Sequence, residues 1–209
     1  MSVKTTENIL ASATQTLQTA KYGLDDYLGK IPERRETGLR NMIVFSRAVT
    51  NVIQNLRSTV GKREFNMWYE PWQLKMKEDA VMKAFYQMRT EILKQGVLET
   101  SLSMHIEHLN TNDLQPLMQN PPQNAVGFFI GDNLGGSGWE ILMPDGEKEK
   151  YYVDLPKEVK IKTFLELKNL PKVSVKDKEG EFYNTQDMVK YYYDFLVVLV
   201  NNAKLTFLV

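Results

Sequence analysis

The feature that most constrains this fold is a row of apolar residues between positions 33 and 60, spaced 3, 4, 3, 4 and 4 residues apart. Its members are Met42, Phe45, Val49, Val52, Leu56 and Val60. This spacing places them on one face of an α-helix, and such a face must be buried against a neighbour. A second row precedes it, comprising Ile9, Ala13, Leu17, Ala20 and Leu24. It predicts a helix over residues 5–29, followed by stop signals at Gly29 and Pro32. The two helices together predict an antiparallel pair.

The next segment is rich in aromatic residues, with Phe65, Trp68, Tyr69 and Trp72 on one helical face. Aromatic residues bury a large area, so this face predicts core or a subunit interface, with a ligand platform as the less favoured alternative. Pro71 lies among them, and proline disrupts a helix interior but suits a first turn. The sequence therefore predicts a short helix ending before Glu70 and a new helix from about Pro71 to Gln95, capped by Gly96.

The second half of the chain has a different residue pattern from the first. A polar connector over residues 110–124 precedes three apolar segments that predict strand cores at 128–130, 139–143 and 151–155. The sequence Pro144-Asp145-Gly146 predicts a turn, and residues 178–180 predict another. The apolar run within residues 185–205 predicts a buried closing helix. We therefore predict a mainly α (α+β) protein. It would be a single domain over 1–209, with an antiparallel helical bundle over about 5–96 plus 185–205 and a small antiparallel β-hairpin or meander over about 125–183.

Composition excludes several classes of function. The 209 residues include no cysteine and two histidines, which excludes disulfides, thiolate metal sites and cysteine nucleophiles. His105 and His108, even with Glu107 and Asp113 nearby, make a poor metal site, because catalytic metals usually take three protein ligands. We therefore expect no metal and no cofactor. The N-terminus lacks a secretory signal and no apolar run is long enough to span a bilayer, which predicts a cytoplasmic protein without membrane contact.

Charge is distributed unevenly along a chain whose formal net charge is zero. Residues 1–96 carry 15 Lys and Arg against 10 Asp and Glu, and contain every arginine. This asymmetry either is neutralised within the fold or marks an anionic partner. The glycine-rich segment Gly131–Gly138 is followed by a strand-like sequence and by no Walker-type lysine. It therefore predicts a hairpin connection, with a phosphate cradle as the less favoured reading.

Arg89 is the most informative single residue. It lies four residues after Phe85 and three before Ile92, at a step where the apolar period of its helix lacks a member. The pattern places its guanidinium on or beside the packed face, where an unpaired charge is costly. Either Arg89 forms a salt bridge or clamps a carbonyl, or it is held in a groove where it can meet a phosphate.

Two long helices followed by a helix with the sequence Arg89-Thr90-Glu91-Ile92-Leu93-Lys94 resemble the HEPN superfamily of bacterial helical domains. That family is marked by an arginine, a polar residue and a histidine five or six positions later. Many members are dimeric, metal-independent ribonucleases that act as toxins or in antiviral defence. Here Lys94 stands where the histidine is expected. Because lysine has an unperturbed pKa of about 10.4, it is a poor base near neutrality. The resemblance therefore implies a non-catalytic or altered member. The segments NMIVFSRAVTNVIQNLRS and WYEPWQ also resemble uncharacterised bacterial proteins.

These observations favour a non-enzymatic helical binding or regulatory protein, HEPN-like and homodimeric, with a protein partner or RNA as its ligand. The alternative is a HEPN-like ribonuclease, in which Arg89 binds the scissile phosphate, Lys94 assists, and Thr90 or Glu91 orients them. A small-molecule or metal-dependent enzyme is a third, less favoured reading.

Overall fold

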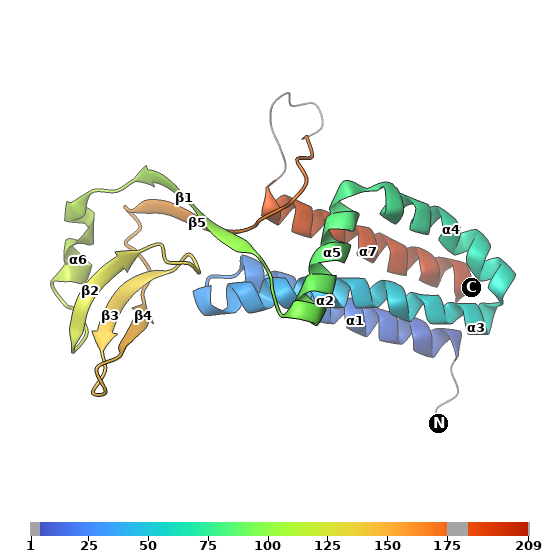
Figure 1. Ribbon diagram of the computed structural model, residues 1–209, viewed down its shortest axis with the longest axis horizontal. Coiled ribbons are helices and arrows are strands. Elements are labelled where there is room, and N and C mark those ends of the chain that lie inside the picture. Colours follow the sequence, from blue (N-terminus) through green and yellow to red (C-terminus); the bar gives the residue numbers. More distant parts are fainter. Residues whose placement is uncertain (1–4, 175–183, 209) are drawn as a thin grey trace. The chain divides into compact units, whose positions relative to one another are not determined.

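The computed structural model describes residues 5–174 and 184–208. It divides the chain into two compact units. The helical unit contains residues up to 30, 34–99 and from 167 onward, and the strand unit contains residues 31–33 and 100–166. The predicted class is confirmed, because helices dominate and the strands form two small sheets (Figure 1).

The helical unit opens with two long helices, α1 (Thr6–Leu28) and α2 (Pro32–Ile53). The Thr5 hydroxyl accepts a hydrogen bond from the Asn8 amide and caps α1. The 3-10 turn η1 (Gln54–Leu56) and the short helix α3 (Arg57–Val60) extend α2 as far as Gly61. The predicted pair of helices is thus present, and Pro32 is the first residue of the second helix rather than a stop signal. Proline suits that position because the first helical amide needs no partner within the helix.

The buried face of α2 differs in part from the predicted stripe. Phe45, which the spacing placed in the core, is 36% exposed. The face that packs is rotated toward the residues Leu39, Met42, Ile43, Ser46, Val49, Thr50 and Ile53. Two glycines explain how closely this face approaches α1. A Cβ atom on Gly23 would lie 2.5 Å from the Met42 amide nitrogen, and one on Gly38 would lie 2.6 Å from the Tyr27 amide nitrogen. The helices touch backbone to backbone, which only glycine permits.

The third part of the helical unit corrects the prediction at Pro71. Helix α4 (Lys62–Glu78) continues through Pro71, and the break comes at Asp79, before α5 (Ala80–Gln95). The Asp79 side chain caps α5 by accepting a hydrogen bond from the Met82 amide. The predicted end of this helix at Gly96 is confirmed, with a left-handed φ of 69°. Aromatic packing holds α4 in place on both sides of its proline. Trp68 lies edge-on to Phe207, and Trp72 lies edge-on to Phe195.

The closing helix α7 (Thr185–Phe207) is confirmed and packs against the earlier helices. It contacts α1 along its length, receives the two tryptophans of α4, and stacks Tyr192 on Phe85 of α5 with a centroid distance of 4.8 Å. The Trp68 indole donates a hydrogen bond to the Asn202 amide oxygen at 2.7 Å. Phe65 and Tyr69 are buried in the same core, so the aromatic face is largely core.

The strand unit contains two sheets. In the first, β2 (Ala125–Ile130), β3 (Ser137–Leu142) and β4 (Lys148–Tyr152) pair antiparallel in that order. The predicted turn at Pro144-Asp145-Gly146 joins β3 to β4, and Gly146 has a φ of 87°. In the second, β1 (Thr100–His108) pairs with β5 (Lys160–Leu167). Sequence analysis did not predict β1 or β5, so strand structure begins before the expected boundary at residue 125.

Between β1 and β2, the polar connector folds into a 3-10 turn, η2 (Thr111–Leu114), and the short helix α6 (Gln115–Met118). The second predicted turn, at residues 178–180, lies outside the described residues. Among the residues that the structure does describe, no helix is both long enough and apolar enough to cross a membrane.

Candidate ligand-binding groove in the helical unit

A cavity of about 450 Å³ opens in the helical unit between α2, η1, α4, α5 and α7. Its charged lining is entirely cationic and consists of Arg47, Lys77 and Lys83. Its aromatic lining consists of Tyr69, Tyr86 and Tyr192, and the remaining wall is formed by Gln54, Gln73, Met76 and Met82. The combination of apolar walls with a few convergent polar groups is typical of small-molecule sites.

The three cations have no neutralising carboxylate. No Asp or Glu lines the cavity, and the described part of the chain gives none of the three an ion pair. Some cations of the helical unit do have such partners, as Arg34 has in Asp26 and Arg40 has in Glu36. Uncompensated cations around one cavity raise the local concentration of anions.

Arg47 is held in place by its neighbours. Its Nη1 donates a hydrogen bond to the Thr50 hydroxyl, and its guanidinium carbon lies 5.2 Å from the centre of the Tyr86 ring. A cation over an aromatic face in this range is attracted by the ring. Because these contacts engage one edge and one face of the guanidinium, Arg47 is partly preorganised and keeps N–H donors for a ligand.

Two of the tyrosines are buried, Tyr69 at 4% exposed and Tyr192 at 3%. Burial raises the pKa of Tyr192 to about 12, against the opposing charges of Arg47 and Arg89. Burial likewise raises the pKa of Tyr69, opposed by Arg47 and by the Gln54 side chain. Both phenols are therefore protonated at neutral pH. The Tyr192 hydroxyl has no hydrogen-bond partner within the described residues, which leaves it as a donor for a ligand.

The structure places Arg89 beside this groove. Its Nε is buried without a hydrogen-bond partner in the described chain, and its charge acts on the pKa of Tyr192. The salt bridge or carbonyl clamp that sequence analysis weighed is not found for Arg89 among those residues. A buried, unsatisfied donor on a cation costs free energy unless an anion or water satisfies it.

The other proposed catalytic residues are not gathered around Arg89. The Thr90 hydroxyl donates to the Tyr86 carbonyl at 3.0 Å, and Glu91 accepts a hydrogen bond from Gln87 at 2.9 Å. Lys94 is exposed in the last turn of α5. Five residues along an α-helix correspond to a rotation of about 140°, so Arg89 and Lys94 lie on different faces of α5.

The histidines do not form a metal site in the described part of the chain, where no cluster of three His, Asp or Glu side chains exists. Both lie on β1, where a spacing of three residues puts them on opposite faces. His108 contacts Asp113 at 3.1 Å, while Glu107 accepts a hydrogen bond from Lys162 at 2.6 Å. Each of these contacts joins only two side chains, so neither histidine gains the further ligands that a metal site requires.

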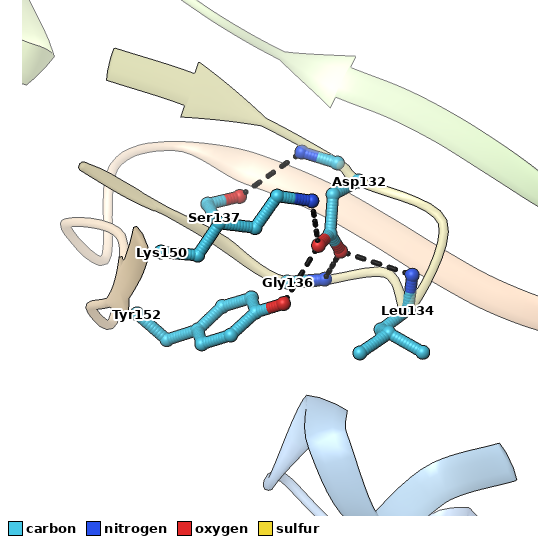
Figure 2. Close-up of polar contacts among 7 residues, drawn as sticks. Asp132, Leu134, Gly136, Ser137, Lys150 and Tyr152 are labelled. Atoms are coloured by element: carbon cyan, nitrogen blue, oxygen red, sulfur yellow. Dashed lines mark hydrogen bonds and ion pairs between the residues drawn. The ribbon is translucent and has the colours of Figure 1, made fainter. Parts of the chain in front are cut away.

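The glycine-rich segment is the connection between β2 and β3, as predicted, and its centre is Asp132. Figure 2 shows the Asp132 carboxylate surrounded by donors. One oxygen accepts the amides of Leu134 and Gly136 at 3.0 Å each, and the other accepts Lys150 at 2.6 Å and Tyr152 at 2.7 Å. Burial alone would raise the pKa of Asp132, but these hydrogen bonds outweigh it and lower the pKa. The loop's own carboxylate thus occupies two of its amides, which argues against a phosphate cradle.

The sequence alone does not distinguish Arg47, Lys77, Lys83 or Tyr192 as site residues. Arg47 did carry one signal. No Asp or Glu lies three or four residues from it in either direction, whereas Arg40 has Glu36 four residues before it. An arginine without such a partner in its own helix is available to other groups.

Together, the fold and the groove define a class: a helical bundle with a small antiparallel β unit and, among its helices, a cavity whose charged lining residues are cationic. Comparison with known families adds one similarity. Residues 25–127 match the family model described as bacteriophage lambda protein ea47. That range includes every charged residue of the groove, and Tyr192 lies beyond it. Comparison with curated proteins found no match, and comparison with solved structures found none either.

Proposed function

We propose that the helical unit is a non-enzymatic binding module for a small anionic ligand, which it holds in the groove between α2, α4, α5 and α7. The observation that carries the proposal is the lining itself. Arg47, Lys77 and Lys83 converge on one cavity from three helices, without a carboxylate among the lining residues. Each of these cations can donate charge-assisted hydrogen bonds to a bound anion.

The test uses an anionic aromatic dye, 8-anilinonaphthalene-1-sulfonate, whose fluorescence rises on binding. Arg47→Gln and Lys83→Gln each remove one charge from the groove and keep a polar side chain. A hydrogen bond to a charged group contributes about 1.5–3 kcal/mol, so each variant should bind the dye about tenfold more weakly or worse.

Lys190→Gln is the matched control, because Lys190 is an exposed lysine near the start of α7 that does not line the groove. Its dye affinity should stay within about twofold of the wild type. Equal losses in all three variants would show that the dye responds to overall charge, and unchanged binding in Arg47→Gln and Lys83→Gln would refute the proposal.

A homodimer in the cytoplasm, with a protein or RNA partner, belongs to the same proposal. Three exposed apolar residues support association. Tyr191, Val198 and Leu205 follow α7 at seven-residue spacing and are 47%, 56% and 73% exposed. These residues give one apolar position per heptad on the exposed side of α7, which is available to a second helix. Light scattering at micromolar concentrations should give twice the mass of the chain, and a monomer throughout would contradict the dimer.

The ribonuclease is the second candidate, and one observation favours it: the buried Nε of Arg89 lacks a partner and could receive a phosphate. Against it, Thr90 is engaged with the backbone and Lys94 lies on another face of α5. If the protein cleaves RNA without metal, a folded Arg89→Ala variant should lose that activity. Cleavage that Arg89→Ala leaves intact would reject this candidate.

A further inference from the structure

The number of cations in the groove indicates how many negative charges its ligand carries. Three cations line it without a carboxylate, and the Tyr192 hydroxyl adds a neutral donor. A single carboxylate would leave most of this charge uncompensated. A ligand with two or more negative charges fits it better, and phosphate groups accept several N–H and O–H donors at once.

The groove also limits the ligand's length. Its cations come from separate helical segments and converge on a cavity of about 450 Å³, within the range of about 300–1,000 Å³ typical of small-molecule sites. A protein that binds a nucleic-acid strand instead presents cations along a track, with stacking side chains for successive bases. The geometry favours one compact ligand over a polymer.

The remaining wall suits a flat ring. Met76 and Met82 offer polarizable surface, and the Tyr86 ring is 55% exposed. Gln73 is exposed and has no hydrogen-bond partner in the described chain. An amide supplies both donors and an acceptor, which is what the edge of a nucleobase requires.

We infer that the ligand of the groove is a mononucleotide with at least two phosphates, whose phosphates meet Arg47, Lys77, Lys83 and the Tyr192 hydroxyl while its base lies against Met76, Met82 and Tyr86. This inference rests on the proposed function and specifies its ligand class. Gln73 is then the residue placed to contact the edge of the base.

Isothermal titration of the full chain with adenosine, AMP, ADP, ATP, GTP, UTP and inorganic pyrophosphate tests the inference. We expect ADP and ATP to bind at least tenfold more tightly than AMP, because a further phosphate reaches a further cation. They should also bind at least tenfold more tightly than pyrophosphate, because the base buries apolar area. Arg47→Gln and Lys77→Gln should each weaken ADP about tenfold, and Lys190→Gln should stay within about twofold.

Gln73→Ala provides a second, milder variant, because its side chain is exposed and its loss should leave the fold intact. It should change the ratio of ATP, GTP and UTP affinities and leave pyrophosphate binding unchanged. Far-UV circular dichroism shows whether each variant is folded.

The outcomes separate this inference from the proposed function. If pyrophosphate binds as tightly as ADP and depends on Arg47, the anion site stands and the nucleotide is refuted. If a single-stranded oligonucleotide binds more tightly than every mononucleotide, the compact ligand is refuted. If neither pyrophosphate, nucleotide nor dye binds in an Arg47-dependent way, the proposed function itself fails.

Discussion

Asp132 should be the most sensitive polar position of the strand unit. Its side chain is 6% exposed and accepts four hydrogen bonds, two from backbone amides and one each from Lys150 and Tyr152 (Figure 2). Asp132→Asn keeps an oxygen for the amides but presents an NH₂ group to the lysine. Hydrogen bonds to charged groups contribute about 1.5–3 kcal/mol. Lys150 is 41% exposed, so its ammonium group can hydrogen-bond to water when the carboxylate is removed. The free energy of unfolding should therefore fall by an amount at the low end of this range, about 1.5–2 kcal/mol.

Asp132→Ala removes all four of these hydrogen bonds. It leaves the amides of Leu134 and Gly136 without an acceptor, as well as Lys150 and Tyr152, so the free energy of unfolding should fall by about 3–5 kcal/mol. Glu140→Gln is the matched control in the same sheet. Glu140 pairs with Lys148 at 3.0 Å, but its side chain is 38% exposed, and such exposed pairs contribute about 0–1 kcal/mol.

The assay is urea unfolding followed by ¹⁹F NMR of protein labelled with 5-fluorotryptophan. Trp139 lies in β3, while Trp68 and Trp72 lie in α4, so the Trp139 signal reports the strand unit separately from the helical unit. A Trp139 midpoint that falls no further in Asp132→Asn than in Glu140→Gln would refute the argument from burial.

Three further outcomes are expected. The stability advantage of the wild type over Asp132→Asn should disappear in acid. Because folding lowers the pKa of Asp132, the stabilisation by its carboxylate is present above the ordinary pKa of about 4 and is lost as the pH falls through the pKa of the folded state. Urea unfolding at a series of pH values measures this loss. Folding raises the pKa of Tyr192 to about 12, so the free energy of unfolding should fall between about pH 10 and pH 12. Tyr192→Phe should reduce this fall in urea unfolding curves. An equal fall in the wild type and the variant would contradict the role of Tyr192. Gly23→Ala should destabilise the helical unit by about 1–3 kcal/mol, although alanine has the better helix propensity, because the added Cβ would meet the α2 backbone. Ser12→Ala, at an exposed position of α1, is the control and should leave the stability nearly unchanged. Thermal unfolding measures both variants.

Local signals located most of the helical unit. Apolar periodicity predicted α1 and α2, an apolar run predicted α7, and glycines marked the end of α5 at Gly96 and the β3–β4 turn at Gly146. These signals succeed because a helix face or a tight turn depends on residues a few positions apart. Pro71 shows where the local rule fails. Its missing hydrogen bond is a local cost, and the packing of Trp68 and Trp72 on α7 offsets it.

The unpredicted strands have a different cause. β1 does alternate, with Leu102, Met104 and Ile106 separated by polar residues, but it is exposed over most of its length and these apolar side chains form no buried face. Its partner β5 lies more than fifty residues further along the chain. A short alternation of this kind does not by itself reveal the distant segment whose hydrogen bonds make it a strand.

By itself, the sequence determined the helical class, the two long opening helices, the buried closing helix and the unusual position of Arg89, because each follows from the pattern of residues within one segment. Only the tertiary structure brought Arg47, Lys77, Lys83 and Tyr192 around one cavity and set the unpartnered Nε of Arg89 close to that tyrosine. The physical reason is that a cavity lined by cations forms only where residues of separate helices meet in space. Neither the convergence of separate helices nor the absence of a neighbouring carboxylate is encoded in the spacing of any single segment.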